Sequence, residues 1–163
     1  MKMDFRTLTK KPIPDVIKYI KDYLLVNKDI EILIGCDSQS FGTHATVYGV
    51  VIVLYTPGHG GHVLCTSENV SYEKNRHVRL ISEVWKAVEV AEYLKENDVP
   101  APRWIDIDLN PDPKYGSNSV LRQAVGLVEG MGYHVRYKHN GVMASCTANN
   151  LVRQRKKVRL AKV

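Results

Sequence analysis

Long hydrophobic runs are missing from this chain of 163 residues. The longest apolar stretch, Tyr48–Tyr55, is far shorter than the ~20 residues of a membrane-spanning helix, and its valines favour a strand. Cysteine is also scarce: Cys36, Cys65 and Cys146 are an odd number and lie far apart, so no disulfide framework is expected. We therefore expect a soluble protein in a reducing, cytoplasmic setting, with no membrane partner.

Several common site signatures are incomplete. Gly58–Gly61 lacks the Lys-Ser/Thr ending of a phosphate-binding P-loop. His59, His62 and Cys65 flank a predicted turn, but no fourth ligand follows at a zinc-site spacing. These segments therefore favour a hairpin over a nucleotide or zinc site.

Charge of one sign is in excess. The 23 Lys and Arg residues outnumber the 17 Asp and Glu residues, and the net charge is +6. Such an excess favours an anionic partner, because cations release counterions when they neutralise phosphates. We expect nucleic-acid contacts from a cationic cluster late in the chain, made of Arg153, Arg155, Lys156, Lys157 and Arg159. A second, weaker basic candidate surface contains Lys74, Arg76 and Arg79.

The periodicity of apolar residues predicts a mixed α/β fold, and no repeat or linker interrupts it. The expected elements are a helix near 13–24, strands at 30–37, 46–55 and 62–72, a helix at 77–97, a strand at 104–109, a helix at 117–130, a strand at 133–137 and a helix at 145–155. This order predicts a five-stranded mixed sheet flanked by helices, with its first three strands antiparallel and β/α alternation after them. We expect one domain over 1–163, with a helical extension at 1–28 and a basic stretch at 153–163.

Three acidic residues occupy positions from which they can converge. Asp37 closes the first predicted main strand, Asp108 lies at the end of the fourth, and Glu83 lies in the intervening helix. Hard divalent cations prefer such oxygen ligands, and metal ions held this way promote phosphodiester cleavage. The pattern indicates a metal site that acts on a nucleic-acid phosphate.

The same residues carry a family resemblance. With Gly35-Cys36-Asp37-Ser38-Gln39 at its first main strand, the chain resembles the ribonuclease H-like superfamily of nucleases, resolvases and integrases. The segments 108–115, 124–126 and 130–133 resemble its YkuK-like group of bacterial and phage proteins. The resemblance implies that Asp37 bridges metal ions and that Asp108 is a second ligand.

The resemblance also implies two further ligand positions. Glu83 matches the helical acid, with Glu68, Glu73 and Glu89 as alternatives. The last acid of the superfamily falls where this chain has Asn149, which keeps a carbonyl ligand but loses a charge and so weakens a second metal.

Residues elsewhere are candidates to compensate for Asn149 or to assist the reaction. Asp106, Asp112 and His139 are candidates to replace the missing acid. Lys138 or His139 is a candidate for proton transfer or phosphate binding.

Three functions remain open from the sequence. The first is a nuclease or related phosphodiester-cleaving enzyme in which Asp37, Glu83 and Asp108 bind Mg²⁺ or Mn²⁺ and a metal-activated water attacks. The second is a noncatalytic nucleic-acid-binding domain with a degenerate site, which Asn149 favours. The third is a structural or interaction protein. Phosphate contacts carry no sugar information, so RNA, DNA, a hybrid and a branched junction are all candidate partners.

Overall fold

A seven-stranded mixed sheet organises the protein, with strand order β2-β1-β5-β4-β3-β6-β7. The computed structural model describes residues 3–137 and 143–160, without the side chains of 143 and 154–160. The strands are β1 (Phe5–Thr7), β2 (Pro12–Ile13), β3 (Glu31–Phe41), β4 (Ala45–Thr56), β5 (Gly60–Ser71), β6 (Trp104–Ile107) and β7 (Val135–Tyr137). The helices are α1 (Val16–Val26), α2 (Arg76–Glu96), α3 (Asn118–Gly130) and α4 (Met143–Leu160).

The pairing of the main strands is as the periodicity predicts. Strands β3, β4 and β5 form an antiparallel meander, and β6 and β7 continue the sheet parallel to β3. The predicted count of five strands was wrong, because residues 5–7 and 12–13 add two short strands. Of these, β1 pairs with β5 at Leu64 and Cys65, and β2 pairs with β1. Neither 5–7 nor 12–13 is long enough to show an alternating pattern.

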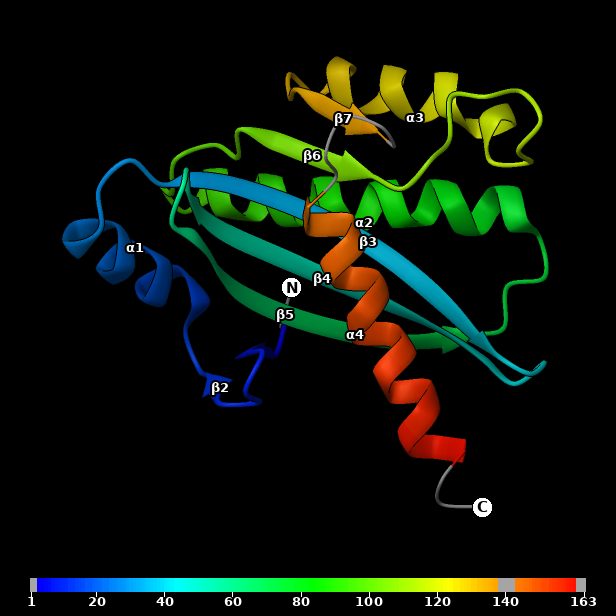
Figure 1. Ribbon diagram of the computed structural model, residues 1–163, viewed down its shortest axis with the longest axis horizontal. Coiled ribbons are helices and arrows are strands. Elements are labelled where there is room, and N and C mark those ends of the chain that lie inside the picture. Colours follow the sequence, from blue (N-terminus) through cyan, green and yellow to red (C-terminus); the bar gives the residue numbers. More distant parts are fainter. Residues whose placement is uncertain (1–2, 138–142, 161–163) are drawn as a thin grey trace.

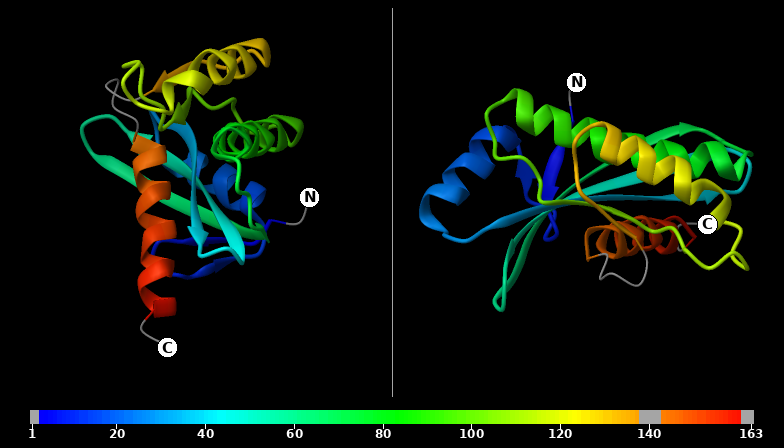
Figure 2. Two further views of the ribbon diagram at one scale, coloured as in Figure 1. Left: turned by 90° about the vertical axis from the view of Figure 1, so that its right-hand side faces the viewer. Right: turned by 90° about the horizontal axis from the view of Figure 1, so that it is seen from above.

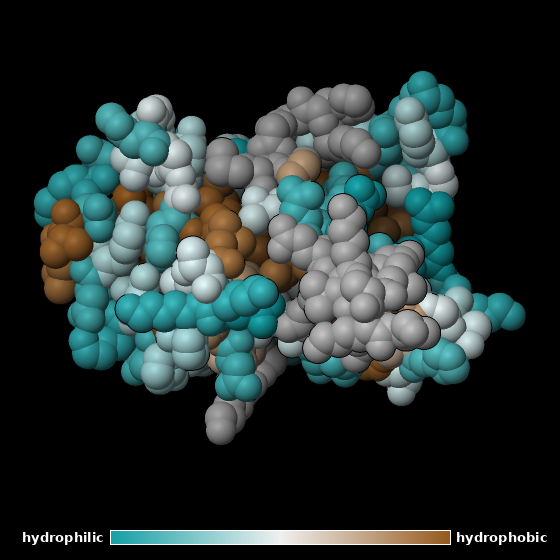
Figure 3. All heavy atoms as spheres, turned by 60° about the horizontal axis from the view of Figure 1, so that its bottom comes forward, coloured by the Kyte–Doolittle hydropathy of each residue, from teal (hydrophilic) through white to brown (hydrophobic). Residues whose placement is uncertain are grey.

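Helices cover both faces of the sheet. Along β3, Ile32, Ile34 and Cys36 join the core beneath α2 and α3, whereas Leu33 packs with residues of α4. Figure 1 shows α4 crossing the front of the sheet with α2 behind it, and Figure 2 shows the two helices on opposite sides. Hydrophilic side chains cover much of the surface seen in Figure 3, and hydrophobic ones show in patches between them. The pleat of β3 therefore sends alternate residues to two different helical layers.

The N-terminal extension carries the predicted helix. Asp15 caps α1 by accepting the backbone N–H of Lys18 at 2.9 Å. The helix is tied to the sheet through the Tyr19 hydroxyl, which lies 2.9 Å from Nε2 of His62, while the Tyr23 ring stacks on the same imidazole. His62 therefore anchors α1 on β5.

The backbone of α4 approaches β3 closely at Gly35. A Cβ atom at this glycine would lie 2.7 Å from the carbonyl carbon of Ala144 and also against the backbone nitrogen of Ser145. These are backbone atoms at the start of a helix, so they cannot rotate away as a side chain can. The absence of a side chain at Gly35 thus allows α4 to pack directly against the backbone of β3.

Gly35→Ala should therefore force α4 away from β3 and lower the free energy of unfolding by about 1 to 3 kcal/mol, the usual cost of overpacking. Gly126→Ala is the matched control. Gly126 lies in α3, and a Cβ atom there would have no other atom within 4 Å. This variant should be neutral or raise stability by about 0.5 to 1 kcal/mol. Urea denaturation of both variants measures the difference. Equal stabilities would mean that α4 shifts without cost.

Candidate functional site

Asp37 lies just beyond the point where β6 stops pairing with β3. That pairing covers Leu33 to Gly35, and Asp108 follows β6 directly. The prediction that Asp37 closes its strand was wrong, because β3 stays paired with β4 as far as Phe41 opposite Ala45. Asp37 is instead an internal residue of β3 that lines a cleft together with Asp108.

One cleft of about 420 Å³ collects all four predicted metal-binding positions. Asp37 comes from β3, Glu83 from α2, Asp108 from the segment after β6 and Asn149 from α4. The other lining residues are Ser38, Gln39, Arg76, Arg79, Leu80, Asn110, Lys114, Tyr115, Gly116, Ser117 and Arg153. The fold therefore brings together side chains that lie far apart in the sequence, although Asp37 does not end its strand and Glu83 and Asn149 come from helices.

Glu83 forms the buried wall of the cleft, with only 7% of its surface exposed. The Ser38 hydroxyl donates a hydrogen bond to its Oε1 at 2.5 Å. Burial raises the pKa of Glu83 to about 8, and the nearby Asp37 adds to the rise. In the metal-free protein Glu83 therefore holds a proton at neutral pH.

Asp37 is less buried than Glu83 and also has charged neighbours. Burial raises its pKa to about 6, the backbone N–H of Ser38 opposes that rise, and repulsion from Asp108 adds to it. Arg153 and Arg79 stabilise the ionised form. Asp37 thus shares its surroundings with a second carboxylate and with two cations.

Comparison with known proteins places this architecture in a family. A family model described as ribonuclease H-like matches residues 13–153. The chain belongs to the ribonuclease H-like family. The match is consistent with the YkuK-like group, and no curated protein matches the chain. In its described part, this ribonuclease H-like chain has no helix long and apolar enough to cross a membrane.

The alternatives to Glu83 lie outside this ribonuclease H-like cleft. Glu68 pairs with Lys86, and together with Glu89 they line a separate pocket between α2 and the sheet. Glu73 accepts the backbone N–H of Asn75 ahead of α2. Glu83 alone of these four acids lines the cleft.

Two of the candidates to replace a missing acid have structural partners. Asp106 is fully buried and accepts hydrogen bonds from Arg136 Nε at 2.8 Å and the backbone N–H of Ala144 at 2.7 Å. Asp112 pairs with Lys114 at 2.8 Å and does not line the cleft. Neither is placed to replace a ligand at Asn149.

Part of the predicted phosphate-binding surface falls outside the described residues. Lys138 and His139 lie there, as do the side chains of Arg155, Lys156, Lys157 and Arg159. Arg153 is described and lines the cleft.

The cleft also holds cations that the sequence ranked low or missed. Arg76 and Arg79, expected on a weaker separate surface, line the same cleft, and so does Lys114. In the sequence, only its position six residues after Asp108 indicated that Lys114 could lie near the site.

The raised pKa of Glu83 makes stability depend on pH. Its folded pKa of about 8 exceeds the ordinary 4.5, so the folded state binds more protons and the stability of the metal-free protein falls as pH rises through that interval. Glu83→Gln should remove this loss. The free energy of unfolding of Glu83→Gln, minus that of the parent, should therefore increase by more than about 1 kcal/mol between pH 5 and pH 8. That is roughly the free energy that corresponds to a pKa shift of one unit.

Denaturation in EDTA across this range tests the expectation, with Glu89→Gln, exposed on the same helix, as the control. Parallel pH profiles for Glu83→Gln and the parent would show that Glu83 is already ionised in the folded protein at neutral pH.

Proposed function

We propose that this ribonuclease H-like protein cleaves phosphodiester bonds of nucleic acid with the help of Mg²⁺ or Mn²⁺. The observation that carries the proposal is the convergence of Asp37, Glu83 and Asp108, from three separate elements, in a cleft that also holds cations. Acidic side chains attract a metal ion and cationic side chains attract phosphate. The same cleft can therefore bind both the metal ion and the phosphodiester.

The donor set suits a hard divalent cation. Mg²⁺ is usually held by one or two carboxylates together with substrate phosphates and waters. Asp37 and Asp108 supply two carboxylates that repel each other, and Asn149 supplies a carbonyl oxygen at the same cleft. Within 3–137 and 143–160, no three His, Cys, Asp or Glu side chains form a ready-made metal site. The residues therefore fit a cation that also needs the substrate, rather than a closed protein cage.

The side chains of the cleft would have different roles in metal binding, phosphate binding and proton transfer. When bound, the metal ion would polarise the phosphate and favour ionisation of water. Asp37 and Asp108 would hold the ion, and Arg79 and Arg153 would orient and neutralise the phosphate. Glu83, with its Oε1 engaged by Ser38, would carry a proton at Oε2 at neutral pH and exchange it with a reacting oxygen.

A second candidate function is binding of nucleic acid without cleavage. It is favoured by Asn149 on α4 and by the charge of the cleft, where Arg76, Arg79, Lys114 and Arg153 face three carboxyl groups. Four cations against three acids, one of them protonated, can attract phosphate without any metal. A screen of RNA, DNA, hybrid and branched substrates in Mg²⁺ or Mn²⁺ separates the two functions.

Asp37→Asn should abolish metal-dependent cleavage, because it removes a ligand charge with little change of shape. We expect a loss of more than about 100-fold, the scale of losing one strong electrostatic contact to a transition state. The control is Asp29→Asn, an exposed position with φ of 57° that Asn also tolerates. Undiminished turnover by a folded Asp37→Asn variant would remove Asp37 from the reaction.

Asn149→Asp should tighten Mn²⁺ binding several-fold, because a full negative charge would replace a carbonyl dipole in the cleft that Asp37 also lines. Isothermal titration calorimetry measures the change. Asn150→Asp provides the matched control, since it adds the same charge at the neighbouring, exposed position of α4. If the two variants bind Mn²⁺ equally well, residue 149 has no direct role in the metal site.

A further inference from the structure

An aromatic side chain lies in the cleft with the acids. Tyr115 belongs to the loop between β6 and α3 and lines the cleft with 47% of its surface exposed. Of the described residues that line the cleft, it alone is aromatic. Single exposed aromatic residues are ordinary on a protein surface, but one that lines a cleft can offer its ring to a ligand.

The ring of Tyr115 keeps room for a partner. Lys114 Nζ lies over it, 5.2 Å from the ring centroid. Among the described side chains, no aromatic ring stacks on it. The ring therefore has a cation on one face, and its exposed part remains for a flat ligand.

The loop that carries Tyr115 is fixed by side chains that bond to its backbone. The buried Asn110 accepts the backbone N–H of Asp112 at 3.0 Å, and Asn118 Nδ2 donates to the carbonyl oxygen of Pro111 at 2.7 Å. Such bonds, together with the fixed φ of proline, restrict the backbone ahead of Tyr115. Less conformational entropy is then lost when the ring binds a ligand.

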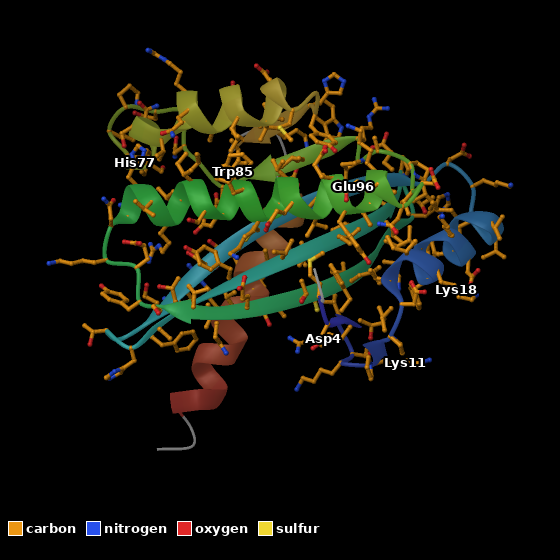
Figure 4. All side chains as sticks on the ribbon, turned by 180° about the vertical axis from the view of Figure 1, so that it is seen from behind. Asp4, Lys11, Lys18, His77, Trp85 and Glu96 are labelled. Carbon is orange, nitrogen blue, oxygen red and sulfur yellow. The ribbon has the colours of Figure 1, made fainter. Side chains whose placement is uncertain are left out.

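The same loop lies against the start of α2. A Cβ atom at Gly116 would lie 3.3 Å from Arg76 Nη1, and His77 Nε2 lies 2.9 Å from Oε1 of Gln123 on α3. Figure 4 shows α3 alongside α2, beginning near the end of α2 that carries His77. These contacts fix the loop relative to the helix that carries Glu83.

The charges of the cleft indicate that the flat ligand is a nucleobase. Lys114, next to Tyr115, also lines the cleft and can contact a phosphate of the same strand. An aromatic ring combined with cations in one groove is an arrangement that binds single strands, because every base has a face that can stack on the ring. In a continuous duplex both faces of a base are covered by its neighbours, so only an unpaired base is available to Tyr115.

We propose that Tyr115 stacks on an unpaired base of the bound strand, so that the substrate of this cleft is single-stranded nucleic acid rather than a continuous duplex. This inference deepens the proposed function and rests on it for the identity of the ligand as nucleic acid. It assigns the choice between single strand and duplex to the loop between β6 and α3. The acids cannot make that choice, because contacts to phosphate alone carry no information about the bases.

Fluorescence anisotropy in EDTA and low salt tests the stacking apart from cleavage. The probes are fluorescein-labelled oligothymidine, an abasic chain with the same number of phosphates, and a blunt duplex with G·C-rich ends. The variants are Tyr115→Ala and Tyr115→Phe. Tyr72→Ala is the matched control, because Tyr72 is also exposed and does not line the cleft. Circular dichroism confirms that each variant is folded.

Tyr115→Ala should weaken binding of oligothymidine by about 5- to 150-fold, the effect of losing one base stack. Tyr115→Phe, which keeps the ring, should bind nearly as tightly as the parent. The abasic chain keeps the phosphates but has no base to stack, so Tyr115→Ala and the parent should bind it equally. The same two proteins should also bind the duplex equally, and Tyr72→Ala should match the parent on every probe.

The stacking is overturned if folded Tyr115→Ala loses as much affinity for the abasic chain or the duplex as for oligothymidine, or if Tyr72→Ala loses as much as Tyr115→Ala. If the parent cleaves a substrate in Mn²⁺ and Tyr115→Ala binds oligothymidine as tightly as the parent, the stacking fails and the nuclease function stands. If the parent shows no cleavage while its binding of oligothymidine still depends on Tyr115, the nuclease function fails and the stacking stands. A parent that binds none of the probes would overturn both.

Discussion

A buried carboxylate connects the elements that build the cleft. Asp106 has no exposed surface, and it bonds to Arg136 on β7 and to the backbone N–H of Ala144 in the first turn of α4. A carboxylate at the start of a helix satisfies an otherwise free N–H and interacts favourably with the helix dipole. Removing one partner of such a buried pair typically costs 3–5 kcal/mol, because the other charge is left uncompensated. The position of α4, and with it Asn149 and Arg153, depends on this contact and on the bare backbone of Gly35.

The sequence was informative where a pattern repeats. Alternation in 104–109 correctly separated Ile105 and Ile107, which join the core beneath α2, from Asp106, which bonds to α4. It did not reveal that Asp106 is structural, because no local pattern shows that Arg136 and the first turn of α4 bond to it. The role of Asp106 follows from α4, whose packing against the sheet no local pattern reveals.

Two features of the cleft were beyond sequence patterns for a similar reason. The apolar run that begins at Ile30 predicts a strand that ends at Asp37, yet pairing with β4 carries the strand to Phe41. In the sequence, Arg76 and Arg79 form a basic cluster with Lys74, which predicts a separate surface. Only the loop that carries Gly116, folded back against Arg76, shows that they belong to the cleft.

The mixture of charges in the cleft has an energetic consequence. Arg79 stabilises the ionised forms of both Asp37 and Glu83, whereas burial opposes them. A phosphate bound to Arg79 would use part of that positive charge and leave the carboxyl groups less compensated. They would then either take up protons or bind a cation more tightly. Because coupling between two ligands is reciprocal, a cation bound at Asp37 would strengthen phosphate binding by the same factor. On the proposed function, the strand and the metal ion would therefore each bind more tightly when the other is already bound.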